Sequence, residues 1–238
     1  MKEGLQKMKP QIDSQTPKSI KSPWGRVLNF DKTRIMGIIN ITPDSFYQYS
    51  RKQKAEEILS TAQNMINAGA DVLDIGGMST RPGSDPVDEQ EEEKRIIPAI
   101  KEIRKNHSNI LISVDTYRAS IAQKALDAGA DIINDISGFG FDKGLVDIIA
   151  KNNAPYILMH IKGTPRDMQR NPIYIDLITE MLEYFTAKIE YLIANNIDED
   201  QIIIDPGLGF GKTYQNNLDI IHNMEEFKKL QKPILIAA

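Results

Sequence analysis

Short runs of apolar residues alternate along this chain with longer segments of mixed polarity. The runs begin near residues 35, 71, 110, 131, 155, 201 and 233, and each is continuously apolar rather than alternating. Strands that are buried on both faces have this pattern, because helices cover both sides of a parallel sheet. The chain is therefore predicted to contain seven parallel strands.

The segments between these runs have the period of an amphipathic helix. In residues 54–68 the apolar positions fall on one helical face, and residues 178–192 repeat the pattern. Strands that alternate with helices form either an open doubly wound sheet or a closed barrel. No glycine-rich nucleotide turn follows the first strand. We therefore predict an α/β fold, a TIM (β/α)8-type barrel with about seven strands in this chain.

The tetrapeptide Ala-Gly-Ala-Asp occurs twice, at Ala68–Asp71 and at Ala128–Asp131. The offset between the copies corresponds to two strand-plus-helix units of about 30 residues each. In each copy a helix is expected to end at the glycine, in the left-handed conformation that glycine adopts readily, with a strand following at once.

Each of the first six apolar runs ends at or beside a polar residue. These residues are Asn40, Asp74, Asp115, Asn134, His160 and Asp205. The carboxyl ends of barrel strands meet at one rim, where the active sites of barrel enzymes lie. A helix cap or a turn is the alternative role for any single one of them. Asp135 is the best capping candidate, and Asn134, which faces the other way, is the better site candidate.

Composition narrows the functional classes. The 238 residues carry a net charge of -4, which argues against a nucleic-acid-binding surface, and the absence of cysteine excludes disulfides and thiolate metal sites. No apolar run reaches the roughly 20 residues of a membrane span. Residues 1–22 are polar and lack the apolar core of a signal peptide. We expect a disordered leader over 1–22, one domain over 23–238 and a cytoplasmic location.

The polar rim indicates what could bind there. The glycines of Asp205–Thr213 lack the spacing of a P-loop, and no G-x-S-x-G motif is present. His160 is expected to be hydrogen-bonded rather than a metal ligand. A rim carboxylate without an adjacent arginine, such as Asp205, suits a flat ring with two neighbouring N–H donors. Arg81, in a loop, suits an anionic group.

Six segments together carry a resemblance to a known family. They are MGIINITPDSF (Met36–Phe46), DIGGMSTRPG (Asp74–Gly83), SVDTYR (Ser113–Arg118), GADIINDISG (Gly129–Gly138), ILMH (Ile157–His160) and IIIDPGLGFGK (Ile202–Lys212). In this order they resemble the dihydropteroate synthases, which are pterin-binding enzymes of folate biosynthesis. The resemblance covers roughly residues 24 to 238.

The resemblance implies a transferase with a defined set of partners. It would join 6-hydroxymethyl-7,8-dihydropterin diphosphate to p-aminobenzoate and release pyrophosphate, with Mg2+ as cofactor. Sulfonamides would compete with p-aminobenzoate. A homodimer is possible for such an enzyme, and no nucleic acid or membrane is implied as a partner.

The resemblance also implies residue roles. Asp205 would hold the 2-amino and N3–H groups of the pterin. Asn134 and Asp115 would contact the same ring, and its pocket would be lined by Ile136, Met159, Gly209 and Phe210. Asn40 would bind Mg2+, and Thr80 and Arg81 would close over the reacting centre. Phe46 and Pro82 would contact the aminobenzoate. We expect Asp115, Asp205 and Arg81 to be the catalytic residues.

One departure from the family pattern lies at the end of the sequence. The family continues after PILIAA with a Ser-Arg-Lys stretch and an Arg-x-His pair, whose Lys contacts the pterin and whose Arg and His hold the diphosphate. We therefore expect this polypeptide to be a fragment that is weakly stable and nearly inactive alone. The alternatives are a non-catalytic or decayed pterin-binding module and a corrinoid-linked methyltetrahydrofolate methyltransferase.

Overall fold

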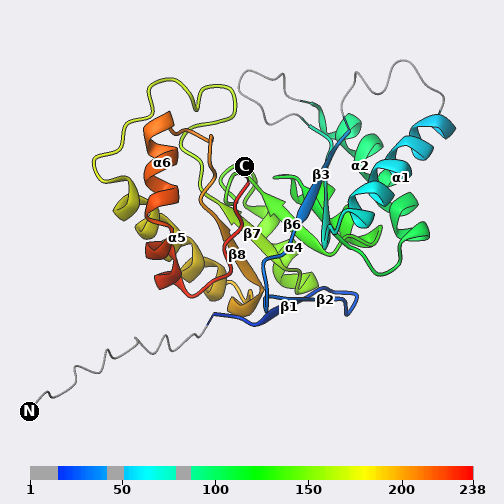
Figure 1. Ribbon diagram of the computed structural model, residues 1–238, viewed down its shortest axis with the longest axis horizontal. Coiled ribbons are helices and arrows are strands. Elements are labelled where there is room, and N and C mark those ends of the chain that lie inside the picture. The colour runs from blue at the N-terminus through cyan, green and yellow to red at the C-terminus, as the bar shows by residue number, and fades with distance from the viewer. Residues whose placement is uncertain (1–15, 42–50, 79–86, 238) are drawn as a thin grey trace, which may run out of the picture.

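The computed structural model describes residues 16–41, 51–78 and 87–237; the side chains of residues 51–54 are excepted. Its centre is a curved sheet of six parallel strands that follow one another in sequence order (Figure 1). The strands are β3 (Met36–Asn40), β4 (Val72–Gly76), β5 (Leu111–Asp115), β6 (Ile132–Asp135), β7 (Tyr156–Met159) and β8 (Ile202–Asp205). Their order and common direction confirm the predicted α/β barrel-type architecture.

Helices cover the outer face of the sheet, in two groups on either side of the view in Figure 1. The helices are α1 (Arg51–Asn67), α2 (Glu89–Asn106), α3 (Ala119–Asp127), α4 (Gly144–Asn152), α5 (Leu177–Ala194), α6 (Tyr214–His222) and α7 (Met224–Phe227), with short 3-10 turns η2 (Glu199–Gln201) and η3 (Lys228–Leu230). α1 and α5 occupy the two segments for which the apolar period predicts a helix. Among the helices described, none combines the length and the apolar character that crossing a bilayer requires.

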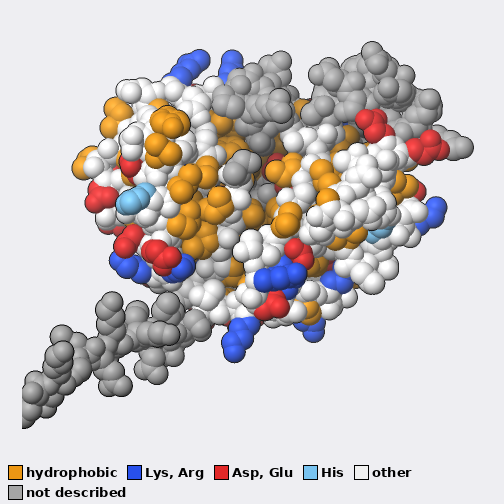
Figure 2. Space-filling model, in the orientation of Figure 1, with side chains coloured by type: hydrophobic (Ala, Val, Ile, Leu, Met, Phe, Trp, Pro, Cys, Tyr) orange, Lys and Arg blue, Asp and Glu red, His pale blue; other side chains and the backbone are white. Residues whose placement is uncertain are grey.

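The prediction of seven strands needs one correction. The seventh apolar run does lie parallel to β8, but it forms a single bridge between Ile204 and Ile234 instead of a full strand. Two backbone hydrogen bonds hold it there, from Ile204 N to Pro233 O at 3.0 Å and from Leu235 N to Ile204 O at 2.8 Å. At the other edge of the described sheet, Ile38 on β3 is 53% exposed. Hydrophobic side chains are visible between the two helix groups in Figure 2.

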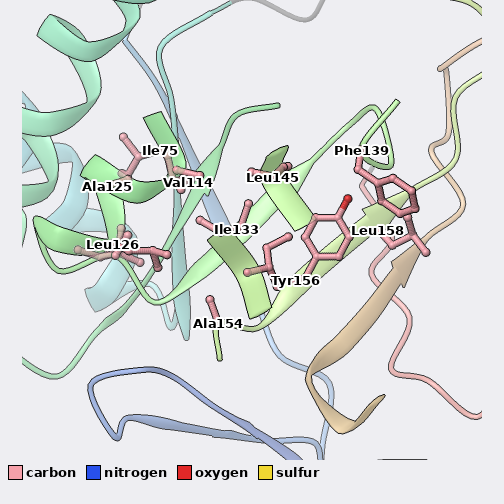
Figure 3. Close-up of a cluster of buried hydrophobic side chains, with 14 of the residues drawn as sticks. Ile75, Val114, Ala125, Leu126, Ile133, Phe139, Leu145, Ala154, Tyr156 and Leu158 are labelled. Atoms are coloured by element: carbon pink, nitrogen blue, oxygen red, sulfur yellow. The ribbon is translucent and has the colours of Figure 1, made fainter. Parts of the chain in front are cut away.

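The outer face of the sheet forms the main hydrophobic core. Alternate strand residues, such as Ile75, Val114 and Ile133, point away from the barrel axis and pack against the helices (Figure 3). Tyr156 and Phe185 are among the largest side chains that are fully buried in the described chain. The continuous apolar runs are explained by this arrangement, because the next residue along each strand faces the barrel interior.

A two-stranded hairpin covers the amino-terminal end of the barrel. It consists of β1 (Ser19–Lys21) and β2 (Val27–Asn29), which pair antiparallel. Ile20 and Leu28 are buried against the first interior residues of the strands; these residues are Val72, Leu111, Ile132, Ile157 and Ile203. The expected leader is therefore wrong for residues 19–22, which are ordered because Ile20 is inserted under the barrel. Residues 1–15 lie outside the described residues.

The two copies of Ala-Gly-Ala-Asp confirm the predicted helix ends, and their aspartates also hydrogen-bond to a neighbouring strand. Gly69 and Gly129 have φ of +100° and +106°, the left-handed conformation expected at these positions. The aspartates then accept hydrogen bonds from the start of a neighbouring strand. Asp71 accepts from Ile35 N at 2.9 Å, and Asp131 accepts from Ile112 N at 2.8 Å.

Asp131 also joins the hairpin to the barrel through two arginines. Arg104 Nη2 lies 2.6 Å from Asp131 Oδ2, and Arg26 Nε from the hairpin lies 2.7 Å from Asp131 Oδ1. The Asp131 side chain is completely buried. Asp71 has one arginine partner, Arg34 at 3.1 Å, in a more exposed setting. The aspartates of the repeat thus help to set the strand register, and Asp131 joins the hairpin to the lower end of the barrel.

Candidate functional site

The carboxyl ends of the strands bring the predicted site residues together inside the barrel mouth. Strand register places Asn40 beside Gly76, Gly76 beside Asp115, and Asp115 beside Asn134. A Cβ atom on Gly76 would lie 2.8 Å from Asn40 Oδ1 and 3.5 Å from Asp115 Oδ2. Glycine at this position therefore leaves space into which the amide and the carboxylate both point.

The opposite side of the mouth is formed by β7 and β8. Met159 pairs with Asp205 in the register of these strands. Met159, Ile136 and Asp205 are all buried, with 3–4% of their surface exposed. Asp205 Oδ1 accepts a hydrogen bond from Gly207 N at 2.7 Å. The predicted acceptor thus lies next to an apolar wall, which suits a flat ring.

The acidic groups of the mouth perturb one another. Burial raises the pKa of Asp205 to about 6, and the charge of Asp74 adds to this shift. Burial raises the pKa of Asp115 well above its usual value, with further contributions from Asp74, Glu92 and Asp135. Among the described residues, none of Asp74, Asp115 and Asp205 forms a salt bridge with an Arg or Lys. Hydrogen-bond donors on a ligand would stabilise their ionised forms.

Asp135 has the structural role that its position predicts. Its carboxylate accepts from Ser137 N at 2.7 Å, from Phe139 N at 2.6 Å and from the Tyr156 hydroxyl at 2.7 Å. It therefore organises the turn after β6 and faces away from the mouth. Asn134, one residue earlier, faces the interior, as expected from the alternation of a strand.

A buried lysine–histidine pair supports the loop after β8, and sequence reasoning missed it. Lys212 Nζ lies 3.0 Å from His160 Nδ1 and donates to the carbonyls of His160 and Phe210 at 3.1 and 3.0 Å. Burial and the lysine charge lower the pKa of His160 to about 3, so the imidazole is neutral and its Nδ1 accepts. His160 is hydrogen-bonded, as predicted. Its partner is 52 residues away in the chain, which no local pattern indicates.

Two glycines of the same loop differ in what surrounds them. Gly207 (φ +67°) has no room for a side chain, because a Cβ there would lie 2.3 Å from His160 O. Gly209 (φ +82°) has nothing within 4 Å of its Cβ position. The open space beside its Cα leaves room for a ligand, which is the role predicted for Gly209 and Phe210.

These surroundings predict different costs for alanine at the two positions. Gly209→Ala is expected to lose about 1 kcal/mol of unfolding free energy, from the left-handed backbone alone. Gly207→Ala is expected to lose about 3 kcal/mol or more, because the backbone strain is joined by a clash with a carbonyl. Urea denaturation followed by circular dichroism measures both values. Equal losses would contradict this account of the loop.

Asp74 is among the polar residues expected at the strand ends, but the sequence assigns it no role in the site. It lies on β4 two residues before Gly76, so both face the barrel interior. A charged residue at an inward position of an apolar strand is the signal that could have identified it. Four of the predicted residues, Phe46, Thr80, Arg81 and Pro82, lie outside the described residues.

Comparisons with known proteins agree with this geometry. The family model of the pterin binding enzymes matches residues 36–238. The dihydropteroate synthase of Synechocystis sp. is 42% identical over 213 residues, which are 90% of this chain and 72% of that protein.

Solved structures of the same kind superpose on this chain. A Yersinia pestis dihydropteroate synthase with a sulfonamide drug has a TM-score of 0.85 and 36% identity, covering 92% of this chain and 78% of that one. A Xanthomonas albilineans dihydropteroate synthase in complex with 7,8-dihydropteroate has a TM-score of 0.78 and 31% identity, covering 90% and 75%. By this match over most of its length, the chain belongs to the dihydropteroate synthases, within the family of pterin-binding enzymes.

Proposed function

We propose that the barrel mouth binds 6-hydroxymethyl-7,8-dihydropterin diphosphate and joins it to p-aminobenzoate, with release of pyrophosphate. The observation that carries this proposal is the group of buried acids that form no salt bridge within the described chain. A buried carboxylate is costly unless something donates to it, and Asp205 and Asp115 have no salt bridge within the described chain. The amino and N–H groups along one edge of a pterin supply such donors.

The ring would lie between the acids and the apolar wall. Asp205 would accept from the 2-amino and N3–H groups, and Asn134 and Asp115 would contact the same ring. Met159 and Ile136 are buried beside these residues and would pack on its face. Gly209 and Phe210 would line the outer part of the pocket, where the backbone of Gly209 is open.

The reaction needs no nucleophile from the protein. The C–O bond between the pterin methylene and the diphosphate breaks, and its electron pair leaves with pyrophosphate. The methylene carbon becomes cationic, and the amino nitrogen of p-aminobenzoate bonds to it and loses a proton. The fixed negative charge of Asp115 would stabilise this cation as it develops.

The oxygen donors at the mouth fit magnesium. Mg2+ usually takes one or two protein oxygens, with waters and substrate phosphates completing its shell. Asn40 Oδ1 faces the mouth and would serve as such a ligand. No cluster of three or more His, Asp or Glu side chains in the described residues is arranged to hold a metal by itself. When bound with the diphosphate, Mg2+ would neutralise the charge of the leaving group.

Other parts of the proposal involve residues and properties beyond the described site. Thr80 and Arg81 would close over the reacting centre, and Phe46 and Pro82 would contact p-aminobenzoate, where sulfonamides would compete. A homodimer and a cytoplasmic location are also part of the proposal. Size-exclusion chromatography and cell fractionation test the last two.

The function is tested by incubating the purified protein with both substrates and Mg2+. At the low rate expected of this polypeptide alone, dihydropteroate, measured by chromatography, and pyrophosphate are expected in equal amounts. A sulfonamide is expected to raise the KM for p-aminobenzoate without changing kcat. Absence of both products, together with absence of pterin binding in calorimetry, would overturn the proposal.

Pterin binding is expected to strengthen as the pH rises through about 6. The pKa of Asp205 is raised to about 6 by burial, so below that pH the carboxyl must lose a proton before it can accept two N–H bonds. The association constant should therefore rise with pH, by up to about tenfold per unit, and level off above the pKa. Calorimetry from about pH 5 to about pH 8 measures this.

An Asp205→Asn variant is the control for the pH series, because an amide does not titrate. Its affinity is expected to be low, and any pH dependence that remains belongs to the other buried acids, Asp115 and Asp74, whose pKa values are also raised. Circular dichroism at each pH checks that the fold is retained. An affinity that stays constant or falls between about pH 5 and about pH 7 in the unmodified protein would contradict the assignment.

A further inference from the structure

Beneath the proposed pterin site lies a layer of polar groups. Asp74 on β4 and Ser113 on β5 are neighbours in strand register, one step deeper than Gly76 and Asp115. Asp74 is 4% exposed and Ser113 is fully buried. The next layer down is the apolar one that the hairpin covers. Asp74 and Ser113 therefore form a polar floor at the bottom of the mouth.

The hydrogen bonds of this floor are incomplete. Asp74 Oδ2 accepts from Asn134 Nδ2 at 3.2 Å. Asp74 Oδ1 and Ser113 Oγ are buried, and neither makes a hydrogen bond of ordinary geometry in the described chain, although Ser113 is near enough to lower the pKa of Asp74. Buried polar atoms are nearly always well paired in folded proteins, so two such neighbours inside a barrel mouth call for a functional explanation.

The one bond that Asp74 does make fixes the direction of a side chain in the site. An asparagine amide has a donating end and an accepting end. Because Asn134 Nδ2 donates downward to Asp74, its Oδ1 is the end that remains for a ligand above the floor. A carboxylate is a pure acceptor when ionised, so it holds the amide in this orientation and disfavours the reverse one. An aliphatic residue at position 74 would leave the amide free to rotate.

The charge of Asp74 reaches the other acids of the mouth as well. It contributes to the raised pKa of both Asp115 and Asp205. The pKa of Asp74 itself is raised, chiefly by burial, while hydrogen bonding to Ser113 and then to Asn134 opposes that shift. An acid that costs stability in this way and joins no salt bridge in the described chain is explained more readily by a role in the site than by a role in folding.

We propose that Asp74 is a positioning residue of the pterin site, which holds the Asn134 amide with its oxygen toward the N–H edge of the bound ring. This inference rests on the proposed function, since it presupposes that the pterin lies above Asn134. Asp74 acts through Asn134 rather than on the reacting atoms.

A double-mutant cycle tests the inference in the purified protein. The probe is 6-hydroxymethyl-7,8-dihydropterin, and its Kd is measured by calorimetry for Asp74→Ala, Asn134→Ala and the double variant. Asp74→Ala is expected to raise Kd about tenfold. The double variant is expected to bind no more weakly than Asn134→Ala alone, because Asp74 has nothing left to orient. Asp74→Asn, whose amide oxygen still accepts, is expected to stay within about threefold of the unmodified protein.

An isosteric exchange provides a second route if alanine at position 74 prevents folding. Asn134→Asp alone places two carboxylates against each other and should weaken binding. Adding Asp74→Asn restores a donor and an acceptor in the reverse sense, since the amide at position 74 donates to the carboxylate at position 134. Recovery of at least about tenfold in Kd is expected.

Three results would overturn the inference. They are an unchanged Kd in Asp74→Ala, losses in Asp74→Ala and Asn134→Ala that multiply in the double variant, and no recovery in the exchange. Each leaves the proposed function intact as long as the unmodified protein binds the pterin and Asn134→Ala weakens that binding. Failure of the unmodified protein to bind the pterin at all would instead reject the proposed function.

Discussion

Replacing Asp205 with alanine is expected to weaken the binding of 6-hydroxymethyl-7,8-dihydropterin by about a hundredfold or more. The proposed contact is a buried carboxylate that accepts two hydrogen bonds from one edge of the ring. Truncating one partner of such a buried, charge-assisted contact typically costs about 2–5 kcal/mol, because the donors on the other partner are left unpaired. Isothermal titration calorimetry at about pH 7.5, above the pKa of about 6, measures the change.

Stability separates a loss of recognition from a loss of fold. The folded-state pKa of Asp205 is raised from 3.8 to about 6, so the ionised carboxylate disfavours the folded state once the pH exceeds its unfolded value. Asp205→Ala should therefore retain the unfolding free energy of the unmodified protein near neutral pH. Asp147→Ala, at an exposed position on α4, is the control and should change neither quantity. Unchanged pterin affinity in Asp205→Ala would reject the assignment of the mouth.

Asp131→Ala is expected to destabilise the protein by about 3–5 kcal/mol. The change leaves two arginines and the backbone N–H of Ile112 without their shared acceptor. Breaking a buried ion pair by removing one partner has this magnitude, since the remaining charges stay partly desolvated. Urea denaturation, followed by circular dichroism, gives the unfolding free energy. Part of the loss is expected to arise because the hairpin, which Arg26 joins to the barrel, detaches at a lower urea concentration than in the unmodified protein.

The other copy of the repeat supplies a matched control. Asp71 occupies the same position in Ala-Gly-Ala-Asp and accepts from Ile35 N, but its side chain is 24% exposed. Asp71→Ala is therefore expected to cost about 1 kcal/mol, because water replaces the lost partners. Asp131→Asn keeps one acceptor oxygen, so its loss of unfolding free energy should lie between those of Asp131→Ala and Asp71→Ala. A loss in Asp131→Ala no larger than in Asp71→Ala would contradict the role given to burial.

Much of the barrel could be predicted from local patterns. Strands buried on both faces are continuous apolar runs, and the residue that ends each run has to lie at the shared rim. That logic leads from the sequence to Asn40, Asp115, Asn134 and Asp205 without knowledge of any contact. It also separates Asn134 from Asp135, because adjacent strand residues face opposite ways.

The features that the sequence did not reveal depend on contacts between distant segments. Lys212 meets His160 only because the loops after β7 and β8 lie together. Asp74 gains its importance from Asn134 on a strand that is not its direct neighbour in the sheet. The strand β1 was missed because three residues with one buried side chain are too short for a period to be recognised. The seventh strand was overestimated because an apolar run indicates burial and not the number of backbone hydrogen bonds.

The hairpin beneath the barrel affects how ligands enter and leave the site. Ile20 and Leu28 close the lower end with packed side chains, so a ring bound above Asn134 does not leave the barrel in that direction. A molecule bound nearer the mouth therefore stands on the route by which that ring leaves. It follows that a drug competing for the outer position would also trap the inner ligand, and its residence time would govern both departures.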